Sequence, residues 1–168
     1  MTTPSRQLPT PRGLLRWLLR LPINLYHLRL GWILGQRFML LEHLGRKSGR
    51  WHQVVIEVVG HNDDSDTYFA ASGWNLRSDW YRNILAHPQV RLSTGHRRRV
   101  TAIAHVLDPA EAGDRLMDYA RRHPIAMKEL AGVMGFPKHD TEADIRAIAE
   151  SLPIIAFHVT PWPQASSN

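Results

Sequence analysis

The sequence predicts an α+β domain in which about six mostly antiparallel strands form a small closed or partly closed barrel with flanking helices. Five strand-like runs follow one another, and several are joined by short turns. A single helix-like segment is inserted after the third run, and a sixth strand comes late in the chain. Because a parallel sheet needs a long connection between each pair of strands, antiparallel pairing fits this order better.

The first three strands are expected at 37–44, 51–60 and 67–72. The second is mostly apolar on both faces, which predicts that both faces are buried. Residues 62–66 form a turn before the third strand, because Asn and Asp side chains bond to nearby backbone. A helix follows at 78–87, where Ser78 is a favoured N-cap, Asp79 suits the positive helix end and His87-Pro88 closes it.

The remainder of the chain continues with two strands, three helices and a last strand. The strands are expected at 89–94, 97–107 and 154–160, and the helices at 108–122, 124–134 and 141–151. Gly95-His96 joins the first two of these strands as a hairpin, and Pro109 suits the first turn of the helix that follows. Apolar residues alternate along the second strand and are expected to face inward: Val100, Ala102, Ala104 and Val106.

The N-terminal part has a different composition. Residues 1–11 hold three prolines and are expected to be a flexible tail, and 12–36 are expected to form basic amphipathic helices. Arginines recur at every fourth position: Arg12, Arg16 and Arg20. Residues 12–21 therefore suit peripheral contact with an anionic membrane, or they cover an apolar opening of the barrel, which is expected to occupy 37–162.

Composition limits the classes of function. The 168 residues fit one domain, and the absence of cysteine excludes disulfides, thiolate nucleophiles and Cys-ligated metal sites. No uncharged apolar run approaches the ~20 residues of a membrane span, and the start lacks the apolar core of a secretion signal, so we expect a cytoplasmic protein. A net charge of +6 favours anionic partners.

Neither a metal site nor a nucleic-acid interface is expected. The ten histidines include no His-Glu-x-x-His pattern. The basic run Arg97-Arg98-Arg99 lies in a strand, whose alternation sends Arg97 and Arg99 to one side and Arg98 to the other. No nucleic-acid-binding motif accompanies this run, so we expect a solvated hairpin end.

The turn Gly45-Arg46-Lys47-Ser48-Gly49 is a candidate anion site. Its glycines allow left-handed backbone and leave N–H groups accessible, while Arg46 and Lys47 add positive charge and Ser48 adds a hydroxyl. It lacks the glycine spacing of a P-loop, and an ordinary basic turn has the same composition.

Three motifs together resemble the deazaflavin-dependent nitroreductase family, whose members use coenzyme F420 on a split, FMN-binding-like β-barrel. They are Gly45-Arg46-Lys47-Ser48-Gly49, Ala71-Ser72, and Asp79-Trp80-Tyr81-x-Asn83 with Pro88 beyond. The likeness covers about residues 30–160. It implies an oxidoreductase that passes a hydride from reduced F420 to an apolar, quinone-like or nitro acceptor.

The resemblance also implies a set of cofactor-binding residues. Arg46, Lys47, Ser48 and Gly49 would hold the phosphate and acidic tail, and His52 would belong to the same anion site. Val54 and Val55 would lie under the ring system, Ala71, Ser72 and Gly73 along its edge, and Trp80 and Asn83 would close the site. The chain departs from the family pattern at His52, where many relatives have Arg, and at Val55, where many have Pro.

Several alternatives stay open at this stage. The proton that accompanies the hydride has four candidate hydroxyl donors besides solvent: Ser72, Tyr26, Tyr81 and Tyr119. Trp74 either narrows the substrate pocket or packs on the barrel rim. FMN is an alternative cofactor for the same barrel, and a non-catalytic module that carries the cofactor or sits on membranes is an alternative to an enzyme.

Overall fold

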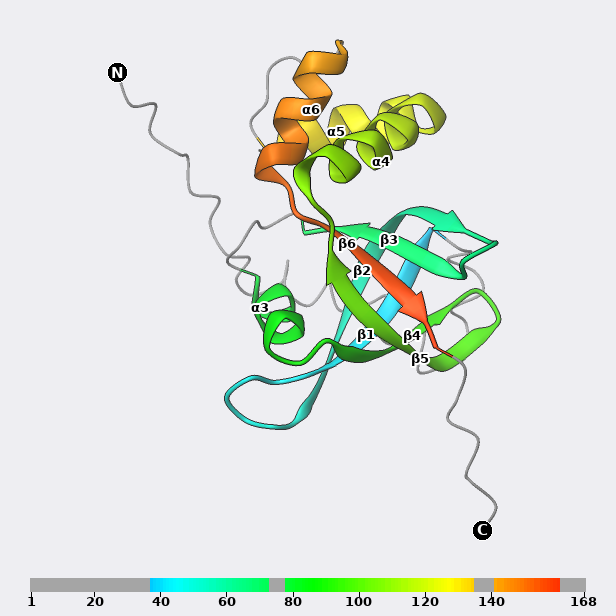
Figure 1. The fold of residues 1–168 in the computed structure, drawn as a ribbon, viewed down its shortest axis with the longest axis vertical. Coiled ribbons are helices and arrows are strands. Elements are labelled where there is room, and N and C mark those ends of the chain that lie inside the picture. The colour runs from blue at the N-terminus through cyan, green and yellow to red at the C-terminus, as the bar shows by residue number, and fades with distance from the viewer. Residues whose placement is uncertain (1–36, 73–77, 135–140, 161–168) are drawn as a thin grey trace, which may run out of the picture.

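Six strands close into a barrel in the order β1-β2-β3-β6-β5-β4 (Figure 1). The computed structural model describes residues 37–72, 78–134 and 141–160. The strands are β1 (Phe38–Leu44), β2 (Trp51–Asn62), β3 (Thr67–Ala71), β4 (Gln89–Thr94), β5 (Arg97–Val106) and β6 (Ile154–Val159). All six neighbouring pairs are antiparallel, as the sequence predicts.

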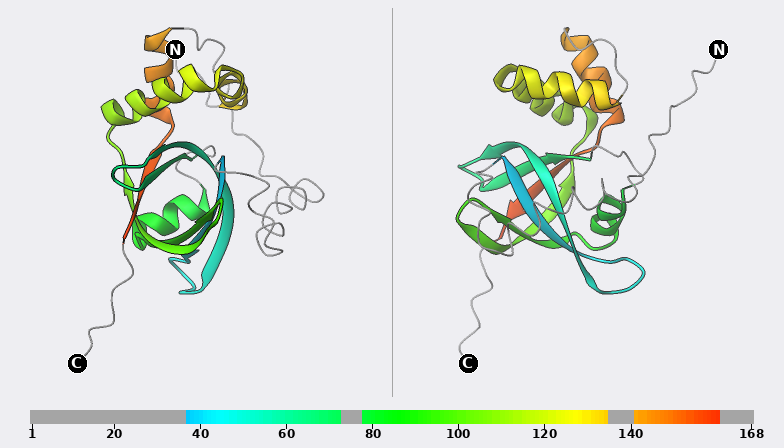
Figure 2. Two further views of the ribbon diagram at one scale, coloured as in Figure 1. Left: turned by 90° about the vertical axis from the view of Figure 1, so that its right-hand side faces the viewer. Right: turned by 180° about the vertical axis from the view of Figure 1, so that it is seen from behind.

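Four helices accompany the barrel within the described residues: α3 (Asp79–Ala86), α4 (Pro109–Arg122), α5 (Pro124–Met134) and α6 (Glu142–Ser151). Figures 1 and 2 show α4, α5 and α6 grouped at one end of the barrel, while α3 lies apart from them beside the β1–β2 hairpin. Caps fix the starts of two helices. The Asp108 side chain accepts from the Glu111 N–H, and Thr141 and Asp144 form a capping box.

Two apolar cores meet across β3 and β6. Ile155 and Phe157 of β6 face the barrel interior, whereas Ile154 and Ala156 pack toward α4 and α6. The barrel interior also takes in Trp80 and other apolar residues of α3, so this helix is anchored directly in the barrel core. Its position is therefore fixed relative to the strands that surround it.

The expectation that β2 is buried on both faces is wrong. Val54, Ile56 and Val58 pack on the interior core, but Trp51 and His52 are exposed and most of the strand is only half-buried. Strands β1, β3 and β6 are buried on both faces, and in β3 and β6 the outer face is covered by the helices.

The expected alternation along Arg97–Arg99 is also wrong. The register between β4 and β5 shifts at this point, and Arg99 has a left-handed φ of +48°. As a result Arg97 pairs with Asp66, while Arg99 Nε donates to Glu42 at 2.9 Å. The two arginines therefore form ion pairs with different parts of the barrel and do not share one side of the strand.

The expected strand and helix bounds are confirmed within about two residues, and Ser78 does occupy the N-cap position of α3. The expected tail at 1–11, the helices at 12–36, Tyr26, Gly73 and Trp74 lie outside the described residues. Among the helices that the structure describes, none is long and apolar enough to cross a membrane.

Candidate functional site

The β1–β2 hairpin turn carries the predicted motif. The Gly45 N–H donates to the Arg50 carbonyl at 2.8 Å, and the Gly49 N–H donates to the Gly45 carbonyl at 2.8 Å. The expectation that these glycines leave their N–H groups accessible is therefore wrong, because both close the turn itself. Gly49 has a φ of +61°, as expected for a turn glycine. Gly45 is needed for a different reason, because an added Cβ would lie 2.5 Å from Ser48 Oγ and 2.7 Å from His52 Nε2.

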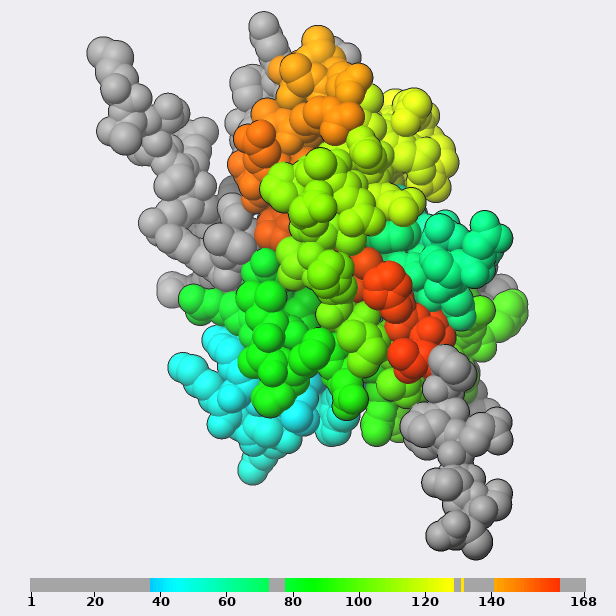
Figure 3. Space-filling view, viewed as in Figure 1, coloured from blue at the N-terminus to red at the C-terminus, as the bar shows by residue number. Residues whose placement is uncertain are grey.

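Arg46 fastens this turn to α3. Its backbone N–H and its Nη1 both donate to Asn83 Oδ1, at 3.1 and 2.8 Å. Its Nη2 lies 3.1 Å from the Asp79 carboxylate, which completes a two-point attachment to the helix. Figure 3 shows the hairpin and α3 adjoining on the molecular surface. The guanidinium that the sequence assigns to ligand binding is therefore already engaged within the protein.

A chain of polar contacts runs inward from this attachment. Asn83 Nδ2 lies 3.1 Å from His43 Nδ1, and the His43 ring stacks on His52 with ring centroids 5.9 Å apart. His52 Nε2 lies 3.2 Å from Ser48 Oγ, which returns the chain to the turn. The hairpin, the end of β1 and α3 are thus joined by side chains that also face the site.

His43 is neutral over the ordinary pH range. Burial lowers the pKa of its imidazole to about 4, and the neighbouring His52 acts in the same direction. Asp79 opposes this shift, but its effect is smaller. His43 therefore takes part in the site as an uncharged hydrogen-bonding group.

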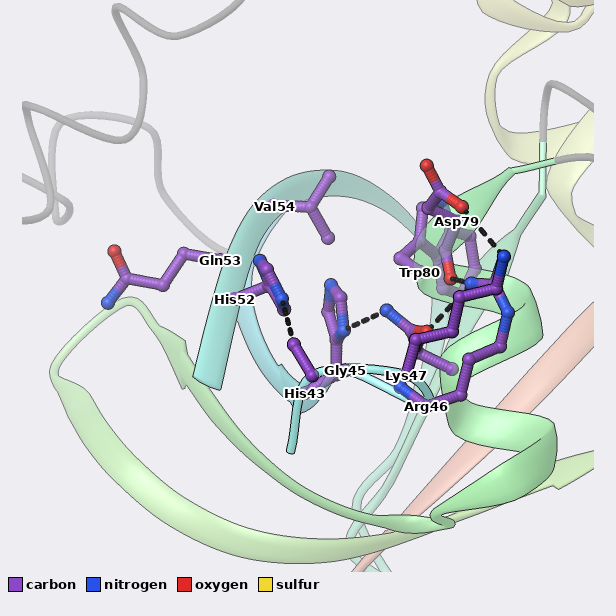
Figure 4. A pocket seen from close by; sticks show the side chains of 11 residues that line it. His43, Gly45, Arg46, Lys47, His52, Gln53, Val54, Asp79 and Trp80 are labelled. Atoms are coloured by element: carbon purple, nitrogen blue, oxygen red, sulfur yellow. Dashed lines mark hydrogen bonds and ion pairs between the residues drawn. The ribbon is translucent and has the colours of Figure 1, made fainter. Parts of the chain in front are cut away.

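A cavity of about 480 Å³ opens between the hairpin and α3 (Figure 4). Its walls are formed by His43, Gly45, Arg46, Lys47, Ser48, His52, Gln53, Val54, Asp79, Trp80 and Asn83. Val54 and Trp80 supply apolar surface, while the histidines and amides supply hydrogen-bonding groups. The volume lies in the range of small-molecule sites, and most of the lining side chains are polar or charged.

The two cations in the cavity wall, Arg46 and Lys47, differ in the contacts that they make within the protein. Arg46 is bound to α3, with 24% of its side chain exposed. Lys47 is exposed and has no hydrogen bond or ion pair with any residue that the structure describes. Its ammonium group is thus available to an anionic ligand, and it is the stronger candidate for direct contact.

The structure brings most of the predicted binding residues together. Seven of them line the cavity: Arg46, Lys47, Ser48, His52, Val54, Trp80 and Asn83. Gly49 lies in the same turn without lining the cavity. Val55 is the neighbour of Val54 on β2, and strand alternation turns it to the opposite face. Ala71 packs against the core under α4 and α6.

The candidate proton donors lie elsewhere. Ser72 is fully buried and its Oγ lies 2.9 Å from Ser78 Oγ, so Ser78 does not use its side chain to cap α3. Tyr81 is buried in the barrel core, where burial raises the pKa of its phenol. Tyr119 lies on the buried side of α4 and donates to Glu57 Oε1 at 2.9 Å. None of these three lines the cavity.

Sequence reasoning missed the role of His43. A usable signal was present, because the short turn pairs Leu44 with Trp51 and therefore His43 with His52. It also missed Gln53, and it named Asp79 as part of the helix start and of the family motif but not as a residue of the cavity wall. No group of three or more His, Asp or Glu residues suited to a metal ion occurs within the described residues.

The cavity fits the deazaflavin that the resemblance implies. A flat ring needs apolar surface, which Val54 and Trp80 provide, and an anionic tail needs an exposed cation, which Lys47 provides. The crowding around Gly45 keeps the turn backbone and Ser48 close to the cavity, where a side chain at that position would displace them.

Solved structures of other proteins share the fold of this chain. The chain is similar to the solved structure of an F420-H2 dependent reductase (FDR-A), with a TM-score of 0.51 and 19% identity over 74% of this chain and 96% of that one. It is also similar to a pyridoxamine 5'-phosphate oxidase-related, FMN binding protein from Nostoc punctiforme PCC 73102, with a TM-score of 0.53 and 11% identity over 88% and 81% of the two chains. These likenesses show a shared split β-barrel.

No curated protein matches the chain. Residues 28–129 match the family described as F420H(2)-dependent quinone reductase. Because that match spans more than half of the 168 residues, the chain belongs to the F420H(2)-dependent quinone reductase family, a family of F420-dependent oxidoreductases.

Proposed function

We propose that this protein binds coenzyme F420 in the cavity between the β1–β2 hairpin and α3, and reduces an apolar, quinone-like or nitro acceptor. The observation that carries the proposal is the position of Lys47, an exposed cation in the wall of a cavity to which Val54 and Trp80 add apolar surface. Family membership supports the cofactor, and the mixed wall suits a ligand with a flat ring and an anionic tail.

In this proposal each residue of the cavity wall has a role that follows from its chemistry. Lys47 binds the anionic tail, while Val54 and Trp80 offer the ring an apolar surface. When bound, the reduced deazaflavin supplies the hydride. Since Ser72, Tyr81 and Tyr119 do not line the cavity, the accompanying proton comes in this proposal from solvent or from Tyr26.

The first test compares the two candidate cofactors. Titration with oxidised F420 and with FMN, followed by fluorescence, is expected to give tighter binding of F420. The F420H2-loaded protein is then expected to be oxidised by a soluble quinone under anaerobic conditions, with one hydride and one proton consumed per quinone. Tighter binding of FMN would support the flavoprotein alternative, and binding without turnover of quinone or nitro acceptors would support a carrier.

Lys47→Ala is expected to weaken F420 binding about tenfold at low salt, because a charge-assisted contact to the tail is lost. The free energy of unfolding should change by less than about 0.5 kcal/mol, since Lys47 is exposed and has no partner among the described residues. The exposed Lys128 on α5 gives a matched control, and Lys128→Ala should leave binding unchanged.

Two further measurements sharpen the Lys47 assignment. The loss of F420 affinity in Lys47→Ala should be smaller at high salt, because screening already weakens the contact in the wild-type protein. It should nearly vanish for a deazaflavin that lacks the phosphate and glutamates. Equal affinity of Lys47→Ala and wild type for full F420 at low salt would rule out this contact.

Arg46→Ala should behave differently from its neighbour. It removes the Nη1–Asn83 and Nη2–Asp79 contacts, so the free energy of unfolding is expected to fall by about 1–2 kcal/mol. F420 affinity should also fall, because the turn loses its attachment to α3. Denaturant unfolding of the Arg46→Ala and Lys47→Ala variants measures the contrast, and equal stability of the two would refute the structural role of Arg46.

We also propose that the protein is cytoplasmic and that residues 12–21 contact an anionic membrane surface, as the spacing of their arginines suggests. Replacing Arg12, Arg16 and Arg20 by Gln is expected to abolish sedimentation with phosphatidylserine vesicles at low salt. The control removes three charges elsewhere by replacing the exposed Arg82, Arg98 and Arg121 with Gln. Equal sedimentation of the first variant and wild type would count against this contact.

A further inference from the structure

His43 presents an unused hydrogen-bond donor to the cavity. The residue is 3% exposed, so almost none of its surface reaches solvent, and its ring forms part of the cavity wall. One ring nitrogen, Nδ1, lies 3.1 Å from Asn83 Nδ2. What the other nitrogen, Nε2, offers to a ligand depends on which nitrogen carries the proton.

The contacts of Asn83 decide this question. Asn83 Oδ1 receives two hydrogen bonds from Arg46, one from the backbone N–H at 3.1 Å and one from Nη1 at 2.8 Å. Because both groups are donors and cannot accept, the side facing Arg46 must be the amide oxygen. The amide nitrogen therefore faces His43 and donates to it.

The orientation of the Asn83 amide determines which nitrogen of the His43 ring carries the proton. A nitrogen that accepts from an amide N–H carries no proton, so Nδ1 is unprotonated and the neutral ring must carry its hydrogen on Nε2. The lowered pKa, which results from burial and from the neighbouring His52, keeps the ring in this neutral form. Asp79 faces the same ring and acts in the opposite direction without reversing the shift.

The Nε2–H group has no hydrogen-bond partner among the described residues. Figure 4 shows the second ring nitrogen of His43 at the end of the ring nearer to Val54. A buried donor without a partner costs free energy, and such groups in folded proteins usually meet a ligand or water. The fold thus holds a neutral donor of fixed direction at the apolar part of the cavity.

We propose that His43 Nε2 donates a hydrogen bond to a carbonyl-type acceptor atom of the ring system bound in this cavity. The inference rests on the proposed function, under which two ring systems enter the site. The pyrimidinedione ring of a deazaflavin offers carbonyl oxygens, and so does a quinone. His43 is a donor that orients the ring, and it neither gains nor loses a proton in the reaction.

A neutral donor suits this position better than a cation. It selects the ring edge that carries acceptor atoms, and it does so without drawing the anionic tail away from Lys47. Asn83 and Arg46 act through His43, because together they fix its tautomer and its direction. They are positioning residues for this contact.

The wild-type protein gives the first measurement, which needs no substitution. Nitrogen-15 NMR of the imidazole rings, without ligand, is expected to show one histidine with unprotonated Nδ1 and protonated Nε2 that stays neutral down to about pH 5. Addition of oxidised F420, or of a quinone, should shift the Nε2–H proton downfield. A ring protonated on Nδ1, or no shift with either ligand, would overturn the proposal.

Variants then identify the ligand that receives the bond. His43→Phe keeps a flat ring but removes the donor, and it is expected to raise the dissociation constant of oxidised F420 about threefold to tenfold and to shift its bound absorption maximum. His43→Gln, which keeps both an acceptor and a donor, should restore most of the affinity. The exposed His105 supplies a matched control, and His105→Phe should change neither quantity.

The outcomes separate the possibilities. If His43→Phe binds F420 as wild type does but has a raised KM for quinone, the bond goes to the acceptor's carbonyl instead. Unchanged binding, spectrum and KM would overturn the proposal. If wild type binds FMN rather than F420, the proposed function fails, but His43 can still be tested with FMN, whose ring contains the same pyrimidinedione.

Discussion

The site depends on one buried amide. Asn83 accepts two hydrogen bonds from Arg46 and donates one to His43, so a single side chain of α3 holds both the hairpin turn and the end of β1. Because α3 is anchored in the barrel core through Trp80, the turn takes its position from the core rather than from its own short backbone. A turn that would otherwise be an exposed loop becomes a fixed wall of the cavity.

The attachment of the turn to α3 gives the adjacent residues Arg46 and Lys47 different roles. Arg46 has a planar group with several donors, which suits attachment to an amide oxygen and a carboxylate at once. Lys47 has a compact charge on a flexible stem, which suits contact with an anionic ligand. The sequence places both in the same motif, and only the packing of α3 against the turn distinguishes them.

The sequence predicts the fold well because its signals are local. Apolar alternation, the glycines of the turns and the caps at Asp108 and Thr141 fix the strands and helices within about two residues. Burial depends on tertiary packing, so neither the exposure of β2 nor the bulge at Arg99 is visible locally. For the same reason the Gly45–Gly49 motif identifies part of the cavity wall. It does not predict that Arg46 binds Asn83 and Asp79, or that His43 offers a hydrogen-bond donor.

A crystal structure of the complex with oxidised F420 tests the central claim most directly. The account predicts that Arg46 keeps its contacts with Asn83 and Asp79, that Lys47 meets the acidic tail and that the ring lies against Val54. An Arg46 guanidinium that has left α3 to bind the phosphate would contradict it, as would a ring bound outside the cavity between the hairpin and α3.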